Sequence, residues 1–327
     1  MSPVERSVAV APETEPHRLI ALLVPGQGKQ RVGMGWELWQ RYPPVKELFS
    51  LASEVTGQDV ARLCFEGPEG ELNKPENAQT AILINHQANL IALQKEGKLH
   101  IEDISLVAGH SLGELSGLVP AGAISVEDLL ILGRERGKGT QIAYERHPSR
   151  MVALKNPSEE IRKLLQTLGV QVCITNTDNL VTFGGLEKAI AEAKRLLTEK
   201  KIPFAEVNVA GAFHTKWMKP AVEYVVEALR RIHIRDARIP LVANTTGKLI
   251  QTRDQIEKEI IAQLTEPVQW DKTIAHLKDQ QTDETIEIGE NNHLSKWNTA
   301  MIGGGITVIT IAGITLASIW RRHHQAH

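Results

Sequence analysis

A serine stands between two glycines in the segment Gly109-His110-Ser111-Leu112-Gly113. The spacing G-x-S-x-G is that of a nucleophile elbow, in which a strand enters a sharp turn, the turn exposes the serine hydroxyl and a helix follows. The flanking sequence fits, because the aliphatic run 104–108 predicts a strand and a helix is expected from Leu112. The N–H groups at the start of that helix would face a developing oxyanion. We therefore expect Ser111 to be a nucleophile, with a purely structural turn as the alternative.

A serine nucleophile needs a base that takes its proton. The histidines after the turn include His147, His214, His233, His276 and His293. Polar surroundings favour solvated positions for His233 and His276, and His147 lies at an expected domain junction. His214 follows Ala210-Gly-Ala-Phe213, where an inserted subdomain should return to the main domain. Position alone gives His214 only a slight preference.

Strands and helices alternate along most of the chain. Short aliphatic runs predict strands at 19–24, 104–108, 239–243 and 285–288, and helical periodicity predicts helices at 36–55 (interrupted at Pro43-Pro44), 78–95, 126–144, 219–233 and 253–264. In the helix over 78–95 we expect Ile82, Ile84, Ala88, Ile91 and Ala92 to share one broad apolar face. This alternation is typical of an α/β fold, whose parallel sheet is covered by helices on both faces.

The middle of the chain has a different order. Strands are predicted at 151–155, 170–175, 180–183 and 203–209, with helices at 158–168 and 186–200. The order β-α-β-β-α-β is the ferredoxin-like pattern. We expect a hydrolase-like parallel-sheet domain over 18–146 and 213–320, a ferredoxin-like insertion over 147–212, and a flexible tail over 1–17.

Composition and charge limit the other function classes. A formal net charge of −2, with no basic helix, argues against a nucleic-acid partner. Cys64 and Cys173 lack metal-ligand spacing, so we expect buried thiols in a reducing, cytoplasmic protein and no metal site. The uncharged stretch Met301 to Trp320 is read as a strand over 306–311 and a helix over 315–320. A membrane tail anchor is the minority alternative.

Several motifs in register resemble one family, the malonyl-CoA:acyl carrier protein transacylases and the related acyltransferase domains of polyketide synthases. The matching stretches are Pro25-Gly-Gln-Gly-Lys-Gln30, Glu76-Asn-Ala-Gln79, Gly109-His-Ser-Leu-Gly-Glu114, Arg136-Gly137, Ala212-Phe-His214, Pro267-Val-Gln-Trp270 and Glu287-Ile-Gly289. The resemblance covers residues 19 to at least 295 and includes the ferredoxin-like insertion. It implies malonyl-CoA as donor substrate, no bound cofactor, and a phosphopantetheinylated acyl carrier protein as partner.

The resemblance also implies catalytic roles. Ser111 would form an acyl-enzyme ester, and His214 would deprotonate first the serine and then the acceptor thiol. The backbone carbonyl of Gln269 would orient the imidazole. The backbone N–H groups of Gln27 and Leu112 would form the oxyanion hole.

The remaining implied roles concern the acyl group. Arg136 would pair with the free malonyl carboxylate, and Gln79 and Phe213 would line the acyl pocket. Each has a structural alternative: a solvated helix face for Arg136, a helix surface for Gln79, and ordinary core for Phe213. Thr140 departs from the family pattern, which has a methionine four residues after the arginine.

Two other functions remain open at this point. The same serine and histidine could pass the acyl group to water, which would make the chain an acyl-thioester hydrolase acting on carrier proteins. A non-catalytic scaffold that binds carrier proteins would leave Ser111 unacylated. An intact Arg136 favours malonyl transfer, because its charge is useful mainly for a dicarboxylic acyl group.

Overall fold

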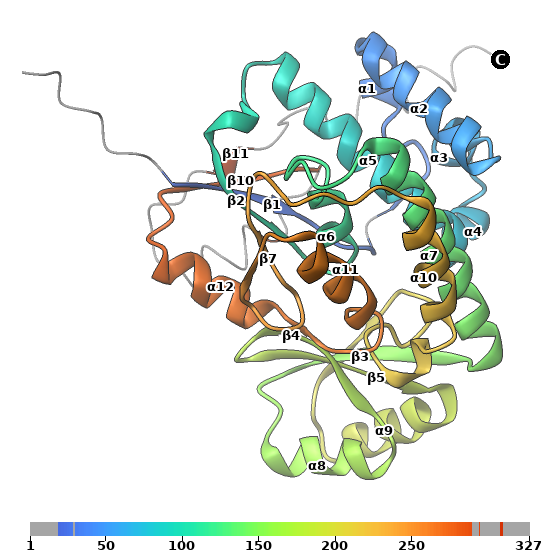
Figure 1. Cartoon of the computed structure of the whole chain (residues 1–327). Helices are drawn as coiled ribbons and strands as arrows, with labels where there is room; N and C mark the ends of the chain where they lie inside the picture. The colour runs from blue at the N-terminus through green and yellow to red at the C-terminus, as the bar shows by residue number, and fades with distance from the viewer. Residues whose placement is uncertain (1–18, 29, 290–293, 295–307, 310–327) are drawn as a thin grey trace, which may run out of the picture.

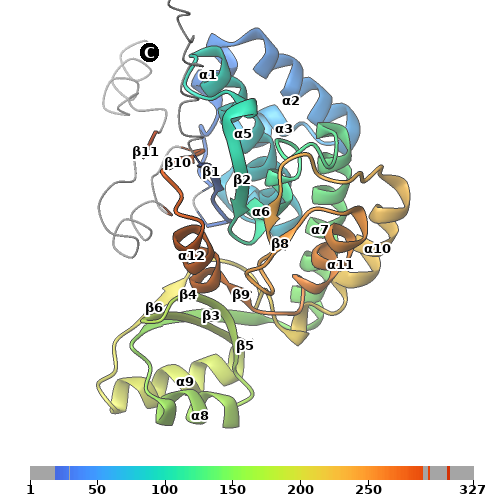
Figure 2. The same ribbon diagram turned by 60° about the vertical axis from the view of Figure 1, so that its left-hand side comes forward.

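The computed structural model describes residues 19–28, 30–289, 294 and 308–309. It shows a large subdomain built on a twisted sheet and a smaller subdomain packed at one end of it (Figures 1 and 2). The large sheet has the strand order β11-β10-β1-β2-β7-β8. Its strands are β1 (Ile20–Val24), β2 (Ile104–Gly109), β7 (Leu241–Val242), β8 (Leu249–Ile250), β10 (Glu284–Glu287) and β11 (Val308–Ile309). All neighbouring pairs are parallel except β7 with β8, so the predicted α/β class is confirmed.

Strand β1 shows why this sheet needs continuous aliphatic runs. Leu22 and Val24 point into a cluster with the helices on one face, while Ala21 and Leu23 point into a cluster on the other face. A strand that is buried on both faces has no polar side to alternate with. The run at 19–24 is therefore apolar throughout.

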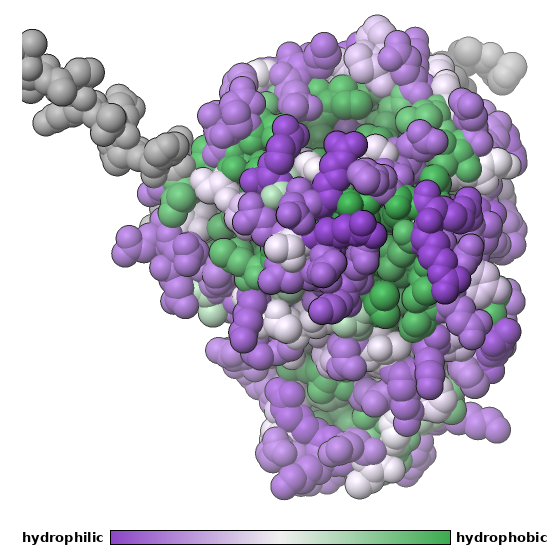
Figure 3. Space-filling view, viewed as in Figure 1, coloured by the Kyte–Doolittle hydropathy of each residue, from purple (hydrophilic) through white to green (hydrophobic). Residues whose placement is uncertain are grey.

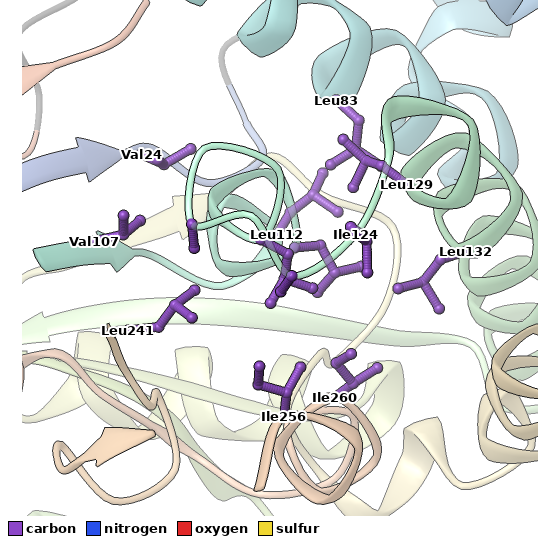
Figure 4. Close-up of a cluster of buried hydrophobic side chains, with 14 of the residues drawn as sticks. Val24, Leu83, Val107, Leu112, Ile124, Leu129, Leu132, Leu241, Ile256 and Ile260 are labelled. Atoms are coloured by element: carbon purple, nitrogen blue, oxygen red, sulfur yellow. The ribbon is translucent and has the colours of Figure 1, made fainter. Parts of the chain in front are cut away.

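Helices cover both faces of the large sheet. On one face lie α5 (Pro75–Lys95), α6 (Leu112–Gly117), α7 (Val126–Arg146), α10 (Ala221–Arg231) and α11 (Arg253–Ala262), and on the other α12 (Trp270–Asp279). The first group closes around a core in which side chains of β1, β2 and β7 meet those of the helices (Figure 4). Short 3-10 turns at Ile101–Asp103 and Lys216–Met218 connect these elements.

Helix α5 differs from the prediction of one broad apolar face. It does not present a single apolar face, because it is buried nearly all round. Ile82 packs into the core against the sheet, whereas Ile84 and Ala88 pack into a second core on the opposite side. The second core is formed with an outer layer of helices: α1 (Trp36–Arg41), α2 (Pro43–Thr56), α3 (Val60–Phe65) and α4 (Glu69–Leu72).

The small subdomain has the ferredoxin-like order. It comprises β3 (Ser149–Lys155), α8 (Glu159–Thr167), β4 (Gln171–Thr177), β5 (Leu180–Leu186), α9 (Glu187–Glu199) and β6 (Phe204–Val207). Its antiparallel sheet has the order β6-β3-β5-β4, and β9 (Val268–Gln269) of the large subdomain extends it in parallel with β4. Apolar side chains of α8 and α9 pack on this sheet. The surface of this subdomain in Figure 3 is mostly hydrophilic.

The ends of the chain are described only in part. Strand β11 lies within the predicted strand 306–311 and pairs with β10. The predicted tail over 1–17, the predicted helix over 315–320 and the rest of Met301 to Trp320 lie outside the described residues. Within the described part of the chain, no helix is both long and apolar enough to cross a membrane.

The fold depends on a close approach between α6 and β1. A Cβ on Gly113 would lie 2.2 Å from the carbonyl oxygen of Val24 and 2.5 Å from that of Pro25. We expect Gly113→Ala to lower the free energy of unfolding by about 1–3 kcal/mol, because the backbones must separate. Urea denaturation measures this. Gly70→Ala in α4, where a Cβ would meet nothing within 4 Å, is the control and should leave stability unchanged or raised by up to about 1 kcal/mol.

Candidate active site

Ser111 lies at a strained turn between β2 and α6. Its φ of 54° and ψ of −116° are unusual for a residue with a side chain. The turn is tied to β1 because the backbone N–H of His110 donates to the carbonyl of Val24 at 2.8 Å. The loop after β1 touches it too, since a Cβ on Gly26 would lie 3.6 Å from the Cβ of Ser111. This is the strand–turn–helix context that the sequence motif predicts.

Leu112 anchors the turn in the core. Its side chain is buried and lies among residues of β1, β2, α7 and α11 (Figure 4). Burying a leucine stabilises a fold by about 1.5–3 kcal/mol. The backbone N–H of Leu112 opens α6 and therefore has no acceptor within the helix. The anchored side chain fixes the direction in which this N–H points.

Asn244 holds the turn from the segment that follows strand β7. Its side-chain oxygen accepts from the backbone N–H of Ser111 at 2.7 Å, and its side-chain nitrogen donates to the carbonyl of Gly109 at 2.6 Å. Both groups belong to the strained turn, so one buried amide holds it from two sides. The sequence analysis missed Asn244. Its signal was a polar residue just after a predicted parallel strand, at the sheet edge where ligands of open α/β sheets bind.

His214 contacts the serine. Its Nε2 lies 2.6 Å from the Oγ of Ser111, within hydrogen-bond reach of a base. Its Nδ1 lies 2.7 Å from the backbone carbonyl of Gln263. A carbonyl only accepts, so Nδ1 carries the hydrogen and Nε2 is left to accept the serine proton. The two residues are 103 positions apart in sequence.

The inserted subdomain delivers His214 to this place. Where the insertion begins, Ser149 accepts from Gly211 N–H at its carbonyl (3.2 Å) and from Ala212 N–H at its Oγ (3.0 Å). These bonds join the start of β3 to the segment that follows β6. The chain then turns at His214, whose φ is 62°. The histidine therefore lies at the return point that the sequence analysis expected.

The prediction that Gln269 orients the imidazole is wrong. The carbonyl at Nδ1 belongs to Gln263, the residue that ends α11. Helix ends leave carbonyls without intrahelical partners, and they form the negative end of the helix dipole. Gln269 lies in β9 instead, where it pairs with Thr175 and donates its N–H to the carbonyl of Asn244. The helix predicted over 253–264 could have indicated Gln263, because the last turn of a helix has carbonyls without intrahelical partners.

The side chain of Gln263 joins the other parts of the site. Its Oε1 accepts from NH2 of Arg136 at 3.1 Å, and its Nε2 donates to the carbonyl of Ser111 at 2.9 Å. The same Nε2 also donates to Glu114. One buried residue thus contacts the serine, the histidine and the arginine. The sequence analysis did not identify it.

Arg136 is buried and faces two amide oxygens. Its NH1 donates to Oε1 of Gln79 at 2.7 Å, opposite the bond from NH2 to Gln263. The solvated helix face that was the alternative for Arg136 is excluded, because the residue is 2% exposed. Gln79 is fully buried as well, so it is not on a helix surface. Burial lowers the pKa of Arg136 to about 10, while the nearby Glu114 raises it.

Glu114 accepts hydrogen bonds from Asn244 and Gln263, which both contact the serine turn. One carboxylate oxygen accepts from the backbone N–H of Asn244 at 2.9 Å, and the other accepts from Gln263. Burial raises the pKa of Glu114 well above its ordinary value, and the nearby Glu259 raises it further. Glu114 therefore ties Asn244 to Gln263, the two amides that hold the turn and the histidine.

Gln27 and Phe213 lie near the site. Gln27 directly follows Gly26, the residue packed against the serine turn. Phe213 lies in a buried cluster with Ala143, Met151 and Cys173, where the two subdomains meet. Cys173 and Cys64 are both buried free thiols, as expected. The roles of Gln27 and Phe213 remain predictions.

The environment of His214 keeps its imidazole neutral. Burial is the main cause, followed by the positive charge of Arg136, and together they lower the pKa of His214 to about 3. The hydrogen bond to the Gln263 carbonyl opposes this shift, and His110 adds a small lowering effect. A neutral imidazole is the form that can accept a proton.

A large cleft reaches His214 from the surface. Its volume is about 1510 Å³, and both subdomains line it, with Arg162 and Gln171 on one side and Lys216, Trp217 and Glu266 on the other. Most small-molecule pockets are about 300–1,000 Å³. This one is therefore an open cleft between the subdomains.

Comparison with known proteins agrees with this geometry. The model of the acyl transferase domain matches residues 22–325. The chain belongs to this acyl transferase family. It is an acyltransferase in which the buried arginine, the serine and the histidine share one hydrogen-bonded network.

Individual members of this family are similar to the chain over most of its length. A malonyl CoA-acyl carrier protein transacylase of Bacillus subtilis (strain 168) is 33% identical over 283 residues, which cover 84% of this chain and 88% of that protein. A polyketide biosynthesis malonyl CoA-acyl carrier protein transacylase of Bacillus velezensis is 30% identical over 284 residues, covering 85% and 94%. A solved malonyl-transacylase, in complex with its type II polyketide synthase acyl-carrier protein, superposes with a TM-score of 0.82 at 29% identity, covering 90% and 96%. The fold expected from the family resemblance is confirmed.

The acyltransferase should keep His214 neutral over an unusual pH range. A histidine with a folded pKa of about 3 is neutral at every pH well above 3, and it becomes charged only as the pH falls through that value. We expect ¹⁵N NMR of histidine-labelled protein to show a neutral His214 from pH 8 to about pH 5. Loss of the signal in His214→Gln assigns it. A protonation midpoint near 6.5 would contradict the effect of burial.

Proposed function

We propose that the acyltransferase moves a malonyl group from coenzyme A to the phosphopantetheine thiol of an acyl carrier protein, by way of an ester on Ser111. The observation that carries this proposal is the bond from Ser111 Oγ to His214 Nε2, at 2.6 Å, within the same network as the buried Arg136. The names of the relatives support the donor and the acceptor.

The first half of the reaction acylates the serine. His214 Nε2 takes the proton of Ser111 as Oγ attacks the thioester carbonyl carbon, which breaks the bond to the coenzyme A sulfur. The proton then passes from Nε2 to the departing sulfur. The bond from Nδ1 to the Gln263 carbonyl keeps the ring in one tautomer throughout. In the second half, Nε2 takes the proton of the carrier thiol, whose sulfur attacks the ester carbonyl carbon. The bond from that carbon to Ser111 Oγ breaks, and Oγ takes the proton back from Nε2.

The carbonyl oxygen of the attacked thioester becomes negatively charged and needs hydrogen-bond donors. We assign them to the backbone N–H groups of Leu112 and Gln27. The N–H of Leu112 opens α6, and that of Ser111 is already used by Asn244. Gln27 belongs to the loop packed on the turn. Such donors each contribute about 2.7–4 kcal/mol in related chemistry.

Arg136 selects the acyl group in two ways. Among the described residues, Gln79 and Gln263 take two of the five guanidinium N–H groups, and the other three are enough for a bidentate pair with a carboxylate. The charge of Arg136 also lowers the pKa of His214. A bound malonyl carboxylate offsets that charge and so raises the basicity of His214. An uncharged acyl group leaves the depressed basicity in place.

Mass spectrometry of the intact protein tests the acyl-enzyme. After incubation with malonyl-CoA, wild type should gain one malonyl group (about 86 Da), and Ser111→Ala should gain none because it lacks the attacking oxygen. Ser116→Ala, a buried serine of the same helix, is the control and should still be acylated. An unmodified wild type would contradict the proposal and favour a scaffold.

The acceptor is tested by adding a phosphopantetheinylated carrier protein to the acylated enzyme. Transfer predicts malonyl-carrier protein in proportion to the acyl-enzyme lost. Release of free malonate in place of malonyl-carrier would show a hydrolase.

Arg136→Ala should change selectivity. We expect kcat/KM for malonyl-CoA to fall by about 100-fold or more, since a buried charge-paired contact is lost, while acetyl-CoA is used equally well or better. Arg134→Ala on the same helix is the matched control, because Arg134 contacts Glu76 rather than the site. Steady-state kinetics with both donors measure the ratio. An unchanged malonyl-to-acetyl ratio would show that Arg136 does not bind the carboxylate.

A further inference from the structure

Thr140 lies one helical turn after Arg136 and is fully buried. Its hydroxyl donates to the carbonyl of Gly137 at 3.0 Å and accepts from Nε2 of Gln79 at 2.8 Å. Gln79 in turn presents Oε1 to NH1 of Arg136 at 2.7 Å. These bonds form a continuous chain from a backbone carbonyl of α7 to the guanidinium.

The polarity of this chain is fixed at both ends. The carbonyl of Gly137 only accepts, so the Thr140 hydrogen must point toward it, which leaves the hydroxyl oxygen to accept from Gln79. The guanidinium only donates, so it requires the oxygen of the Gln79 amide. An amide turned by 180° would place two donors against each other at Arg136 and an oxygen against the lone pairs of Thr140. Chemistry alone therefore decides which way the Gln79 amide faces.

We propose that Thr140 is a positioning residue that sets acyl selectivity by locking the Gln79 amide, and through it the guanidinium of Arg136, in the orientation that receives a carboxylate. The inference rests on the proposed malonyl transfer. Arg136 is held between two amide oxygens, those of Gln79 and Gln263, and Gln263 is fixed by its own bonds to Ser111 and Glu114. Gln79 is fixed in the same way, by the bond from its Nε2 to the hydroxyl of Thr140.

The consequence concerns dicarboxylic acyl groups only. A carboxylate is recognised bidentately when the guanidinium plane has one orientation. Without the hydroxyl of Thr140, the buried Nε2 of Gln79 loses its acceptor, and the amide is held only at its oxygen end, by the guanidinium that it is meant to position. An acyl group without a carboxylate makes no use of that plane. Loss of the hydroxyl should therefore lower the use of malonyl-CoA and spare acetyl-CoA.

Thr140→Val and Thr140→Ser test this, because valine keeps the shape and serine keeps the hydroxyl. We expect the malonyl-to-acetyl ratio of kcat/KM to fall about 10-fold in Thr140→Val and to stay within about twofold in Thr140→Ser, as for loss of one buried hydrogen bond. The fall should arise mainly from KM for malonyl-CoA. Thr140→Ala, which removes the hydroxyl without a branched replacement, serves if the valine variant folds poorly; urea denaturation of each variant checks the fold.

A double-mutant cycle shows whether Thr140 acts through Gln79. In a Gln79→Ala background, Thr140→Val should change the ratio no further. An unchanged ratio in Thr140→Val, an equal fall in Thr140→Ser, or a full effect in the Gln79→Ala background would each overturn the inference. If wild type itself takes up no malonyl group, the proposed function fails. If wild type is acylated but the Thr140 variants do not show the expected malonyl-to-acetyl ratios, only the proposed role of Thr140 fails.

Discussion

The hydrogen bond between His214 Nδ1 and the Gln263 carbonyl organises the whole site. A backbone carbonyl at the end of a helix cannot rotate away or take a proton, so it fixes both the plane and the tautomer of the imidazole. The side chain of the same residue reaches the serine carbonyl and Arg136. The end of α11 therefore fixes the imidazole of His214 and links it to Ser111 and Arg136.

That dependence explains the architecture around the site. The serine turn is held by β1, α6 and the Asn244 amide, all within the large subdomain. His214 arrives from the other side, at the end of a ferredoxin-like insertion whose two ends are tied at Ser149. Strand β9 then joins the small sheet to the large subdomain. The return of the insertion to the large subdomain therefore brings His214 into contact with Ser111.

Sequence reasoning reached the fold and Ser111 from local signals, whereas position gave His214 only a slight preference and the family resemblance assigned its role. The elbow is a five-residue pattern with its own strand and helix, and the return of the insertion follows from the order of elements. Gln263, Asn244 and the partners of Arg136 were harder, since their contacts cross long stretches of chain: Gln263 to Ser111 spans 152 positions and Asn244 to Ser111 spans 133. No periodicity encodes which amide meets which turn. Helix α5 was misjudged for a related reason, because a second helical layer packs against Ile84 and Ala88, away from the core that contains Ile82.

The energetic state of Arg136 points to the kind of ligand that completes the site. A buried charge is costly unless another charge or several hydrogen bonds compensate for it. Among the described residues, the bonds of Arg136 go to the two neutral amides of Gln79 and Gln263, and Nε has no partner. Glu114 raises its pKa, but burial has the larger effect and lowers it. A carboxylate that enters beside Ser111 would take the remaining N–H groups and offset the repulsion between Arg136 and a protonated His214. In the proposed malonyl transfer, the same negative charge would favour both binding and proton transfer, and an uncharged acyl group cannot supply it.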